Sequence, residues 1–169
     1  SRFDFAKLEN LNGIYIRNAD DSYLADIISP LISAKEEIAI SAEQKDVLVK
    51  GMSGLKERAK TIIDLAESAG FYVKSRPLQL NDKAKKLLSD EGKENLSNLL
   101  PILQNLPTWE EEALETAVKG FAEETELKLG KIAQPLRAAL SGSNVSPGIF
   151  EVMEILGKDE SINRITDQI

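Results

Sequence analysis

The sequence predicts an all-α protein made of two consecutive helical subdomains. Apolar residues recur at spacings of three and four along most of the 169 residues, as they do in helices that bury one face. Capping residues and glycine or proline stops separate these stretches, and no segment alternates apolar and polar residues as a half-buried strand would. We place the boundary between Arg76 and Pro77, which gives subdomains of residues 1–76 and 77–169.

The first subdomain is expected to contain helices that begin at capping side chains and end near glycine, proline or asparagine. These expected helices cover residues 4–18, 21–31, 44–50 and 55–69. Gly51 to Gly54 is expected to separate the last two, because glycine weakens a helix. Residues 33–40 fit either a loop or a short helix. Residues 71–73 are expected to be extended before Pro77.

The second subdomain is expected to contain helices with the same kinds of signals. They cover residues 82–88, 96–103, 109–121, 132–140, 147–156 and 159–169. Gly92 is expected to separate the first two of these helices. Pro101 is expected to bend the second helix or to start a new turn. Thr108 and Glu111 have the spacing of a capping box, which predicts the start of the third helix. We interpret Trp109 as an anchor in the core rather than as a platform for a base.

The stretch from Lys128 to Gly157 joins two short helical patterns at a turn rich in small residues. Residues 141–144, Ser-Gly-Ser-Asn, are expected to end the first of these helices. Ser146 is expected to be the N-cap of the next helix and Pro147 its first-turn residue, since proline has no N–H to lose there. On periodicity alone, this stretch is a helical hairpin in an ordinary core.

Composition restricts the classes of function. The formal net charge of −7 argues against a nonspecific nucleic-acid binder, because such proteins usually carry a basic excess. The charge is uneven: residues 50–60 and 74–86 sum to +3 and +4, and residues 108–126 to −6. The absence of cysteine and histidine removes disulfides, thiolate metal sites and imidazole bases. No apolar run approaches the roughly 20 residues that cross a bilayer, so we expect no membrane partner.

The sequence offers little catalytic chemistry. It has no glycine loop that would cradle a phosphate and no metal-binding spacing. Only Asp, Glu, Lys or Tyr could act as a general acid or base, and these residues do not form a recognisable catalytic motif. Glu110 to Glu112 are explained by the preference for negative charge in a first helical turn. We therefore expect no catalytic residue, no metal site and no cofactor in this chain.

The last third of the chain contains a long segment that resembles a known family. The segment LGKIAQPLRAALSGSNVSPGIFEVMEILGK, residues 129–158, closely resembles the C-terminal signature of bacterial-type glutamyl-tRNA synthetases. Residues 2–17 resemble the part of that family that follows its catalytic domain, and Thr108-Trp109 and residues 120–122 match it as well. The resemblance is looser from about Ser33 to Asn105.

The resemblance implies that this chain is the anticodon-binding region of a glutamate–tRNA ligase, holding the anticodon loop of tRNA(Glu). Residues 1–76 would link to the catalytic domain of the same parent chain, whose nucleotide-binding motifs do not occur here. The parent would be a class I synthetase that uses ATP and Mg to form glutamyl-tRNA in the cytoplasm, for protein biosynthesis. We expect a monomer that is not catalytic without that domain.

The resemblance places the anticodon contacts of the family on the turn within the C-terminal hairpin. The residues carried over are Gln134, Arg137, Ser146, Pro147, Gly148 and Ile149. An anticodon loop exposes base edges and faces, so it needs a few donors and some apolar surface. Arg137 has a planar fork of donors, Gln134 donates and accepts, and Pro147 with Ile149 would add apolar surface. The alternative for Arg137 is a salt bridge that locks the hairpin.

Lysines on helix faces are expected to contact the tRNA backbone. These are Lys50, Lys56, Lys60 and Lys131. This sequence departs from the family at one position that affects the choice of tRNA. Family members that exclude tRNA(Gln) resemble one another in having an arginine that corresponds to a position near Leu48. Here no arginine lies between Arg17 and Arg58. Either Lys45 or Lys50 takes the place of this arginine, or tRNA(Gln) is a second partner of the parent enzyme. We favour the hypothesis that the enzyme discriminates only weakly between tRNA(Glu) and tRNA(Gln).

Two other classes of function stay open on the sequence alone. The first is a helical protein-interaction module without RNA binding, whose acidic face at residues 110–126 would bind a basic partner. The second is a small enzyme that uses Lys, Tyr and Asp, which is weaker because no polar residues converge.

Overall fold

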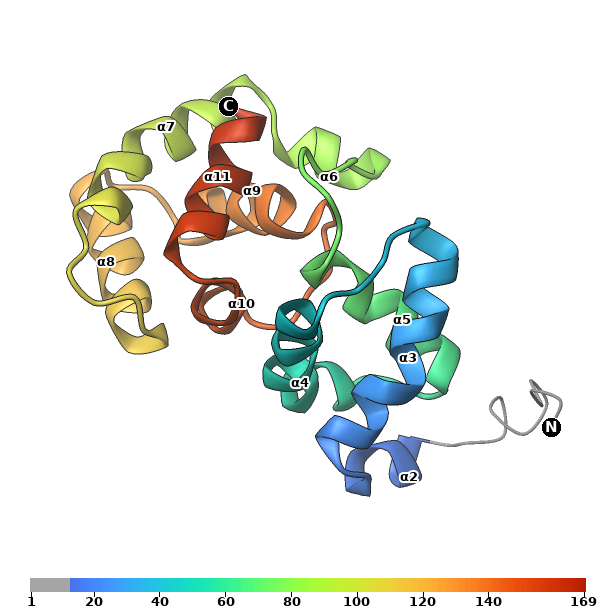
Figure 1. The fold of residues 1–169 in the computed structure, drawn as a ribbon. Coiled ribbons are helices and arrows are strands. Elements are labelled where there is room, and N and C mark those ends of the chain that lie inside the picture. The colour runs from blue at the N-terminus through green and yellow to red at the C-terminus, as the bar shows by residue number, and fades with distance from the viewer. Residues whose placement is uncertain (1–12) are drawn as a thin grey trace, which may run out of the picture. The chain divides into compact units, whose positions relative to one another are not determined.

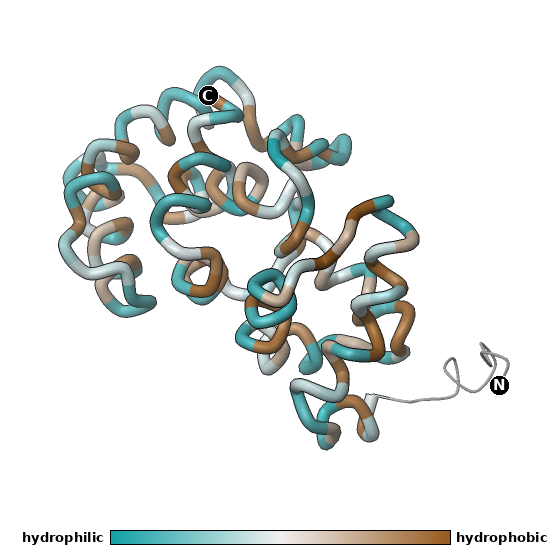
Figure 2. Tube along the Cα trace, viewed as in Figure 1, coloured by the Kyte–Doolittle hydropathy of each residue, from teal (hydrophilic) through white to brown (hydrophobic). Residues whose placement is uncertain are grey.

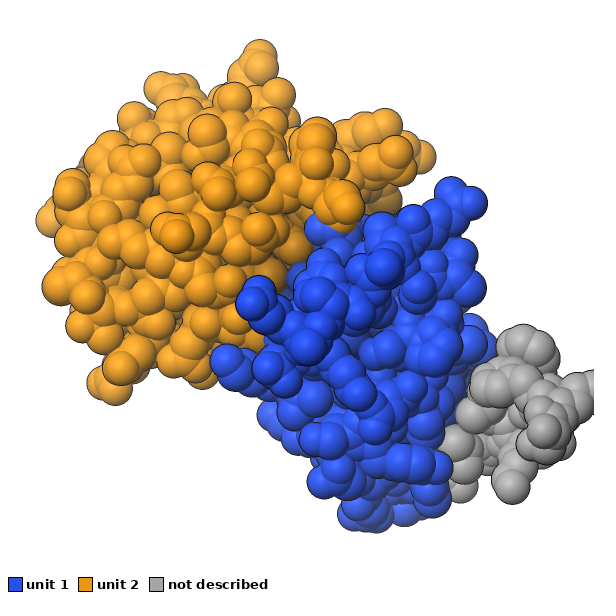
Figure 3. Space-filling view, in the orientation of Figure 1, with its two compact units in different colours: residues 1–74 blue, residues 75–169 orange. Residues whose placement is uncertain are grey.

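Two helical units make up the chain. The structure, a computed structural model, describes residues 13–169, and the chain divides into unit 1, Ser1–Lys74, and unit 2, Ser75–Ile169, coloured separately in Figure 3. Within residues 13–169 the regular structure consists of ten α-helices and one 3₁₀ helix, with no strand (Figure 1), so the predicted all-α class is confirmed. The observed division lies two residues before the predicted boundary. The helix expected to begin at Asp4 lies outside the described residues, apart from its end.

Unit 1 is a small bundle in which three helices pack against one another. Its elements are α2 (Gly13–Asn18), α3 (Asp21–Glu36), α4 (Ala42–Lys56), α5 (Ile62–Ala69) and the 3₁₀ helix η1 (Gly70–Tyr72). The helices α3, α4 and α5 contact one another pairwise, and their apolar positions form the core. Figure 2 shows the matching alternation of hydrophobic and hydrophilic positions along the helices. Asp20 caps α3 as predicted, by accepting a hydrogen bond from the amide of Tyr23.

Two predictions about breaks in unit 1 are wrong. Helix α3 continues past Pro30 to Glu36, so residues 33–36 are helical. Helix α4 passes through Gly51 and Gly54 without a break. Gly51 has a packing role instead, because a Cβ there would lie 2.7 Å from the ring carbon Cε2 of Tyr72. The glycine lets the tyrosine ring approach the helix backbone.

The last helix of unit 1 also begins at a different residue from the one predicted. The expected helix over residues 55–69 is divided, because α4 ends at Lys56 and α5 begins at Ile62. The hydroxyl of Thr61 accepts a hydrogen bond from the amide of Asp64 and so caps α5, a helix start that was not predicted. The predicted stop at Ala69 is confirmed, but residues 71–73 are not extended, because residues 70–72 form η1.

Unit 2 is built around one central helix. Its elements are α6 (Asp82–Leu87), α7 (Asp90–Gln104), α8 (Glu111–Glu124), α9 (Gly130–Ser141), α10 (Ile149–Leu156) and α11 (Lys158–Gln168). Helix α9 packs against α6, α7, α10 and α11, and seven of its residues are buried. Arg76 donates to the carboxylate of Asp167 through Nε (2.9 Å) and Nη2 (3.2 Å), which ties the start of unit 2 to α11. These hydrogen bonds raise the pKa of Arg76.

Two predictions about helix starts and breaks in unit 2 need correction, and of the two alternatives at Pro101 the new turn is excluded. The break after α6 falls at Leu88, and Gly92 lies inside the first turn of α7. Helix α7 also continues through Pro101 to Gln104. Thr108 is not a cap, since α8 begins at Glu111, whose amide donates to a carboxylate oxygen of Glu154 on α10 (3.2 Å). A side chain from another helix thus replaces the local capping box.

The predicted end of α9 is confirmed. The helix stops at Ser141, and Gly142 has a φ of 74°, the left-handed conformation that favours glycine. The backbone oxygen of Gln79 would lie 2.6 Å from a Cβ at this position, so glycine is required for the close approach as well. The carbonyl of Gly142 accepts a hydrogen bond from the amide of Asn81 (2.9 Å). This turn therefore joins the end of α9 to the segment before α6.

Candidate nucleic-acid interface

Helix α9 carries a row of polar side chains between its buried positions. Lys131, Gln134 and Arg137 are spaced by three residues, so they follow one another along one face of the helix. Lys131 is exposed, and Gln134 and Arg137 are half-buried. The residues that anchor the helix lie on the opposite face, including Leu136 and Leu140, which are almost fully buried. The core therefore orients the row away from the centre of unit 2.

Arg137 connects three of the predicted site residues. Its Nε donates to the hydroxyl of Ser146 (3.0 Å), and its Nη1 donates to Oε1 of Gln134 (3.2 Å). These bonds fix the guanidinium on the turn that follows α9, so it need not lose its freedom when a ligand binds. They also hold the two arms of the hairpin together. The alternative interpretation of Arg137 was a salt bridge that locks the hairpin. Arg137 does help to hold the hairpin together, and these two bonds go to a hydroxyl and an amide.

Ser146 has a different structural role from the one predicted. Helix α10 begins at Ile149 with Gly148 at its N-cap, and no side chain caps it. The Ser146 hydroxyl accepts from Arg137 and donates to the carbonyl oxygen of Pro147 (2.7 Å). The prediction that Ser146 caps α10 is therefore wrong, and the two residues after it are not yet helical. We name residues 145–148 the corner.

The corner differs from the prediction in its apolar surface. Pro147 is half-buried and Gly148 exposed, but the side chain of Ile149 is only 5% exposed and belongs to the core. Ile149 cannot offer its side chain to a base, although its amide lies in the first turn of α10. Val145 is the exposed apolar residue instead, at 62%, and its amide donates to the hydroxyl of Ser143. Val145 was not among the predicted site residues, although an isolated valine in a turn of small polar residues was the available signal.

Trp109 is held within unit 2. Its indole Nε1 donates to the carbonyl oxygen of Met153 (2.8 Å), and the Lys158 ammonium lies 6.0 Å from the ring centroid. The ring is half-buried, which agrees with its interpretation as an anchor.

The four predicted backbone-contacting lysines are not equivalent. Lys50 and Lys60 in unit 1 and Lys131 in unit 2 are exposed. Lys56 is engaged inside unit 1, where its Nζ lies 2.6 Å from Oδ1 of Asp21 and donates to the carbonyl of Ala19 (3.1 Å). Its charge is already paired, so we do not assign Lys56 a contact with RNA.

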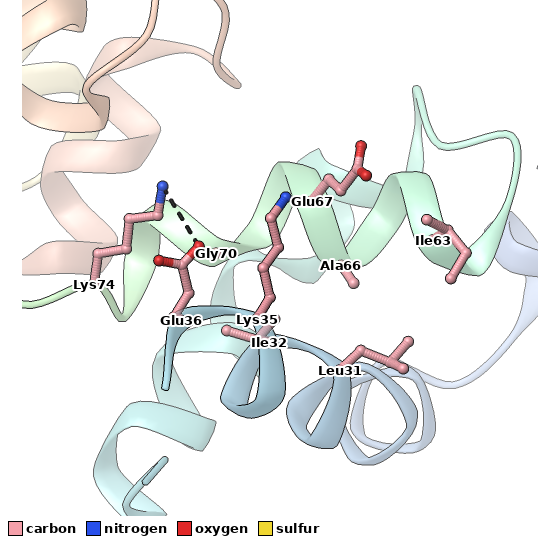
Figure 4. Close-up of a pocket in the computed structure, with 9 residues that line it drawn as sticks. All are labelled: Leu31, Ile32, Lys35, Glu36, Ile63, Ala66, Glu67, Gly70 and Lys74. Atoms are coloured by element: carbon pink, nitrogen blue, oxygen red, sulfur yellow. Dashed lines mark ion pairs between the residues drawn. The ribbon is translucent and has the colours of Figure 1, made fainter. Parts of the chain in front are cut away.

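Unit 1 also contains a depression between α3 and α5 (Figure 4). Its volume is about 180 Å³, and its floor is apolar, with Leu31, Ile63 and Ala66. Its rim carries two lysines and two glutamates, of which Lys74 and Glu36 form an ion pair at 3.7 Å. The charges balance, so the depression does not select an anion.

Other kinds of site find little support in the described residues. Among residues 13–169, no three acidic side chains are grouped so as to hold a metal ion. No helix in the same part of the chain combines the length and apolar character that crossing a bilayer requires. The polar row of α9 and the corner are therefore the strongest candidates. They belong to an all-helical unit and place hydrogen-bond donors beside small residues.

Comparison with known proteins identifies the family. The family model described as the anticodon binding domain matches residues 20–169, and the chain belongs to this family. The chain is 53% identical to glutamate–tRNA ligase 2 of Paramagnetospirillum magneticum, over 100% of this chain and 36% of that protein. It is 48% identical to glutamate–tRNA ligase 2 of Zymomonas mobilis, over 100% of this chain and 35% of that protein.

A solved structure has a similar fold. The crystal structure of a glutamate tRNA ligase from Elizabethkingia meningosepticum matches with a TM-score of 0.74 and 26% identity, over 98% of this chain and 32% of that one. The chain thus spans about a third of the length of the proteins it matches. The resemblance inferred from residues 129–158 is confirmed.

Proposed function

We propose that this chain recognises the anticodon loop of tRNA(Glu) as part of a glutamate–tRNA ligase. The observation that carries the proposal is the similarity to such ligases along the whole chain, at 53% identity in one case. The geometry of unit 2 supports it, because Arg137 and Gln134 lie beside a corner with an exposed glycine and an exposed valine. Donors at fixed positions next to small and apolar surface suit splayed bases.

The proposal divides the work among the site residues. The guanidinium of Arg137 and the amide of Gln134 would read base edges, since a guanidinium offers five N–H groups in a planar fork. The backbone at Gly148 allows close approach, and Pro147 with Val145 would contact a base face. Ser146 positions Arg137 rather than binding the base itself. Lys131, Lys50 and Lys60 would attract the backbone phosphates.

The rest of the parent protein would supply the chemistry. A catalytic domain outside this chain would bind ATP and Mg and charge tRNA(Glu), and this chain would contribute recognition without a catalytic residue. We place the parent in the cytoplasm as a monomer. The acidic face of α8, the basis of the rival protein-interaction module, takes no part in this proposal.

We further propose relaxed discrimination between tRNA(Glu) and tRNA(Gln). Leu48 lies near the position of the arginine that is expected in family members that exclude tRNA(Gln). Its side chain is fully buried in α4. Lys45 forms an ion pair with Asp26, whereas Lys50 is exposed. Charging of both tRNAs by the parent enzyme supports this proposal, and strict rejection of tRNA(Gln) contradicts it.

A titration of the chain with tRNA(Glu) at two salt concentrations tests the main proposal. We expect salt-sensitive binding that Arg137→Ala weakens by about 1–3 kcal/mol, the usual worth of a base contact. A tRNA with an altered anticodon is the matched control for specificity, and it should bind the wild-type chain more weakly. Equal binding of both RNAs, or no effect of Arg137→Ala, would contradict the proposal.

A further inference from the structure

A groove in unit 2 adjoins the polar row of α9. Its volume is about 280 Å³, and it lies among the end of α6, the start of α7 and the first half of α9. Its polar and charged lining residues are Lys86, Ser89, Glu91, Asn95, Lys131 and Gln134. Pockets that hold drug-sized ligands measure about 300–1,000 Å³, so the groove suits a smaller group.

Closely packed segments of α6, α7 and α9 form the floor of the groove. A Cβ on Gly92 would lie 2.4 Å from the carbonyl oxygen of Leu87 and 3.3 Å from Cβ of Pro135. Glycine therefore lets the first turn of α7 close against the end of α6 and against α9. Asn95, 9% exposed, adds a fixed wall through its Nδ2, which donates to the carbonyl of Lys131 (3.3 Å).

The groove has an excess of positive charge. Lys86 and Lys131 are both exposed, and neither ammonium forms an ion pair within residues 13–169. Glu91 is the one carboxylate among the lining residues described. Two unpaired ammonium groups above a preformed floor favour an anion that approaches from solvent. An RNA strand presents such anions at regular intervals.

Gln134 joins the groove to the site already described. It lines the groove and accepts from Arg137 through Oε1, and within residues 13–169 its Nε2 amide donates to no other group. We infer that the groove holds a backbone phosphodiester of the nucleotide next to the anticodon, while Arg137 and the corner hold the anticodon bases. The inference rests on the proposed function and adds a phosphate subsite formed by Lys86 and Lys131. One strand would then run along the polar row of α9.

Matched pairs of lysine substitutions test the subsite in the full 169-residue chain. The test variant is Lys86→Gln with Lys131→Gln. The control is Lys85→Gln with Lys128→Gln, which changes the charge equally at exposed neighbours outside the groove. With an anticodon stem-loop of tRNA(Glu), we expect the test variant to bind about tenfold more weakly. Its plot of log affinity against log salt should lose about 0.7 in slope, the value for one single-strand phosphate.

A chemical change in the RNA locates the contact. In a series of stem-loops, each carries one uncharged methylphosphonate in place of a different phosphodiester. We expect the replacement at one linkage beside the anticodon to weaken binding to the wild-type chain. The same linkage should have no effect on the Lys86→Gln, Lys131→Gln variant. Equal losses in the test and control variants, or no sensitive linkage, would overturn the subsite and leave the proposed function standing. Failure of the wild-type chain to bind any stem-loop would overturn both.

Discussion

Pro135 lies inside α9, where its missing N–H leaves the carbonyl of Lys131 without the usual helical donor. Asn95 supplies the replacement through Nδ2 and is itself buried. A proline in one helix and an asparagine in another thus form a matched pair. Periodicity does not reveal such a pair, because it depends on which helices touch.

We predict that Asn95→Ala destabilises the chain by about 0.5–1.5 kcal/mol, because it removes the hydrogen bond to the carbonyl of Lys131. Urea denaturation measures the change. Asn105→Ala is the control, since the Asn105 amide donates to the carbonyl of Pro101 at an exposed position. A smaller loss is expected there, and equal losses would refute the role given to Asn95.

Arg164 is a second residue with a role that sequence reasoning missed. It is 1% exposed, and it donates to the carbonyl of Leu140 (2.7 Å) and to Glu160 (2.7 Å). The Leu140 carbonyl belongs to the last turn of α9, where no helical amide follows to satisfy it. Arg164 therefore secures the end of α9 just before the turn that leads to the corner.

Replacing Arg164 with alanine is expected to cost about 1.5–3 kcal/mol, because it removes a charged, buried donor from the carbonyl of Leu140. Thermal and urea melts of the chain measure this loss. Lys119→Ala, which removes an exposed ion pair with Glu115, should change stability by less than about 1 kcal/mol. Similar effects of the two substitutions would contradict the role of Arg164.

At the scale of the elements, the glycines show why helix limits were predicted unevenly. Gly142 lies in the turn that was expected to end one helix, and Gly157 follows the helix expected over residues 147–156. Both have positive φ angles at helix ends. Gly51 and Gly92 were expected to break helices, yet each lies within one. Their function is to admit a neighbour, Tyr72 or Leu87, and a local pattern does not contain that neighbour.

Two glycine substitutions in the helices of unit 2 should have opposite effects. Gly92→Ala should destabilise by about 1–3 kcal/mol, because its Cβ would meet a backbone oxygen at 2.4 Å. Gly120→Ala in α8 should stabilise by about 0.5–1 kcal/mol, since nothing lies within 4 Å and alanine favours the helix. Changes of the same sign in denaturation midpoints would contradict the packing role of Gly92.

At the scale of the whole molecule, the fold class followed from the spacing of apolar residues, which is a local property. The candidate site could be predicted from the sequence only in part. The family resemblance predicted Gln134, Arg137 and Ser146 as site residues, and the structure brings these three side chains together. Ile149 was misjudged because its place in the apolar stripe of α10 already required burial. The groove could not be foreseen, because residues from α6, α7 and α9 meet there only after folding.

The central claim is that unpaired anticodon bases bind along α9 and at the corner. The most direct measurement is the change in backbone amide NMR signals of the labelled chain on addition of the tRNA(Glu) anticodon stem-loop. We predict that the largest changes fall within residues 131–149 and shrink when the anticodon bases are replaced. Changes centred on the acidic face of α8, or changes that do not depend on the anticodon, would contradict the claim.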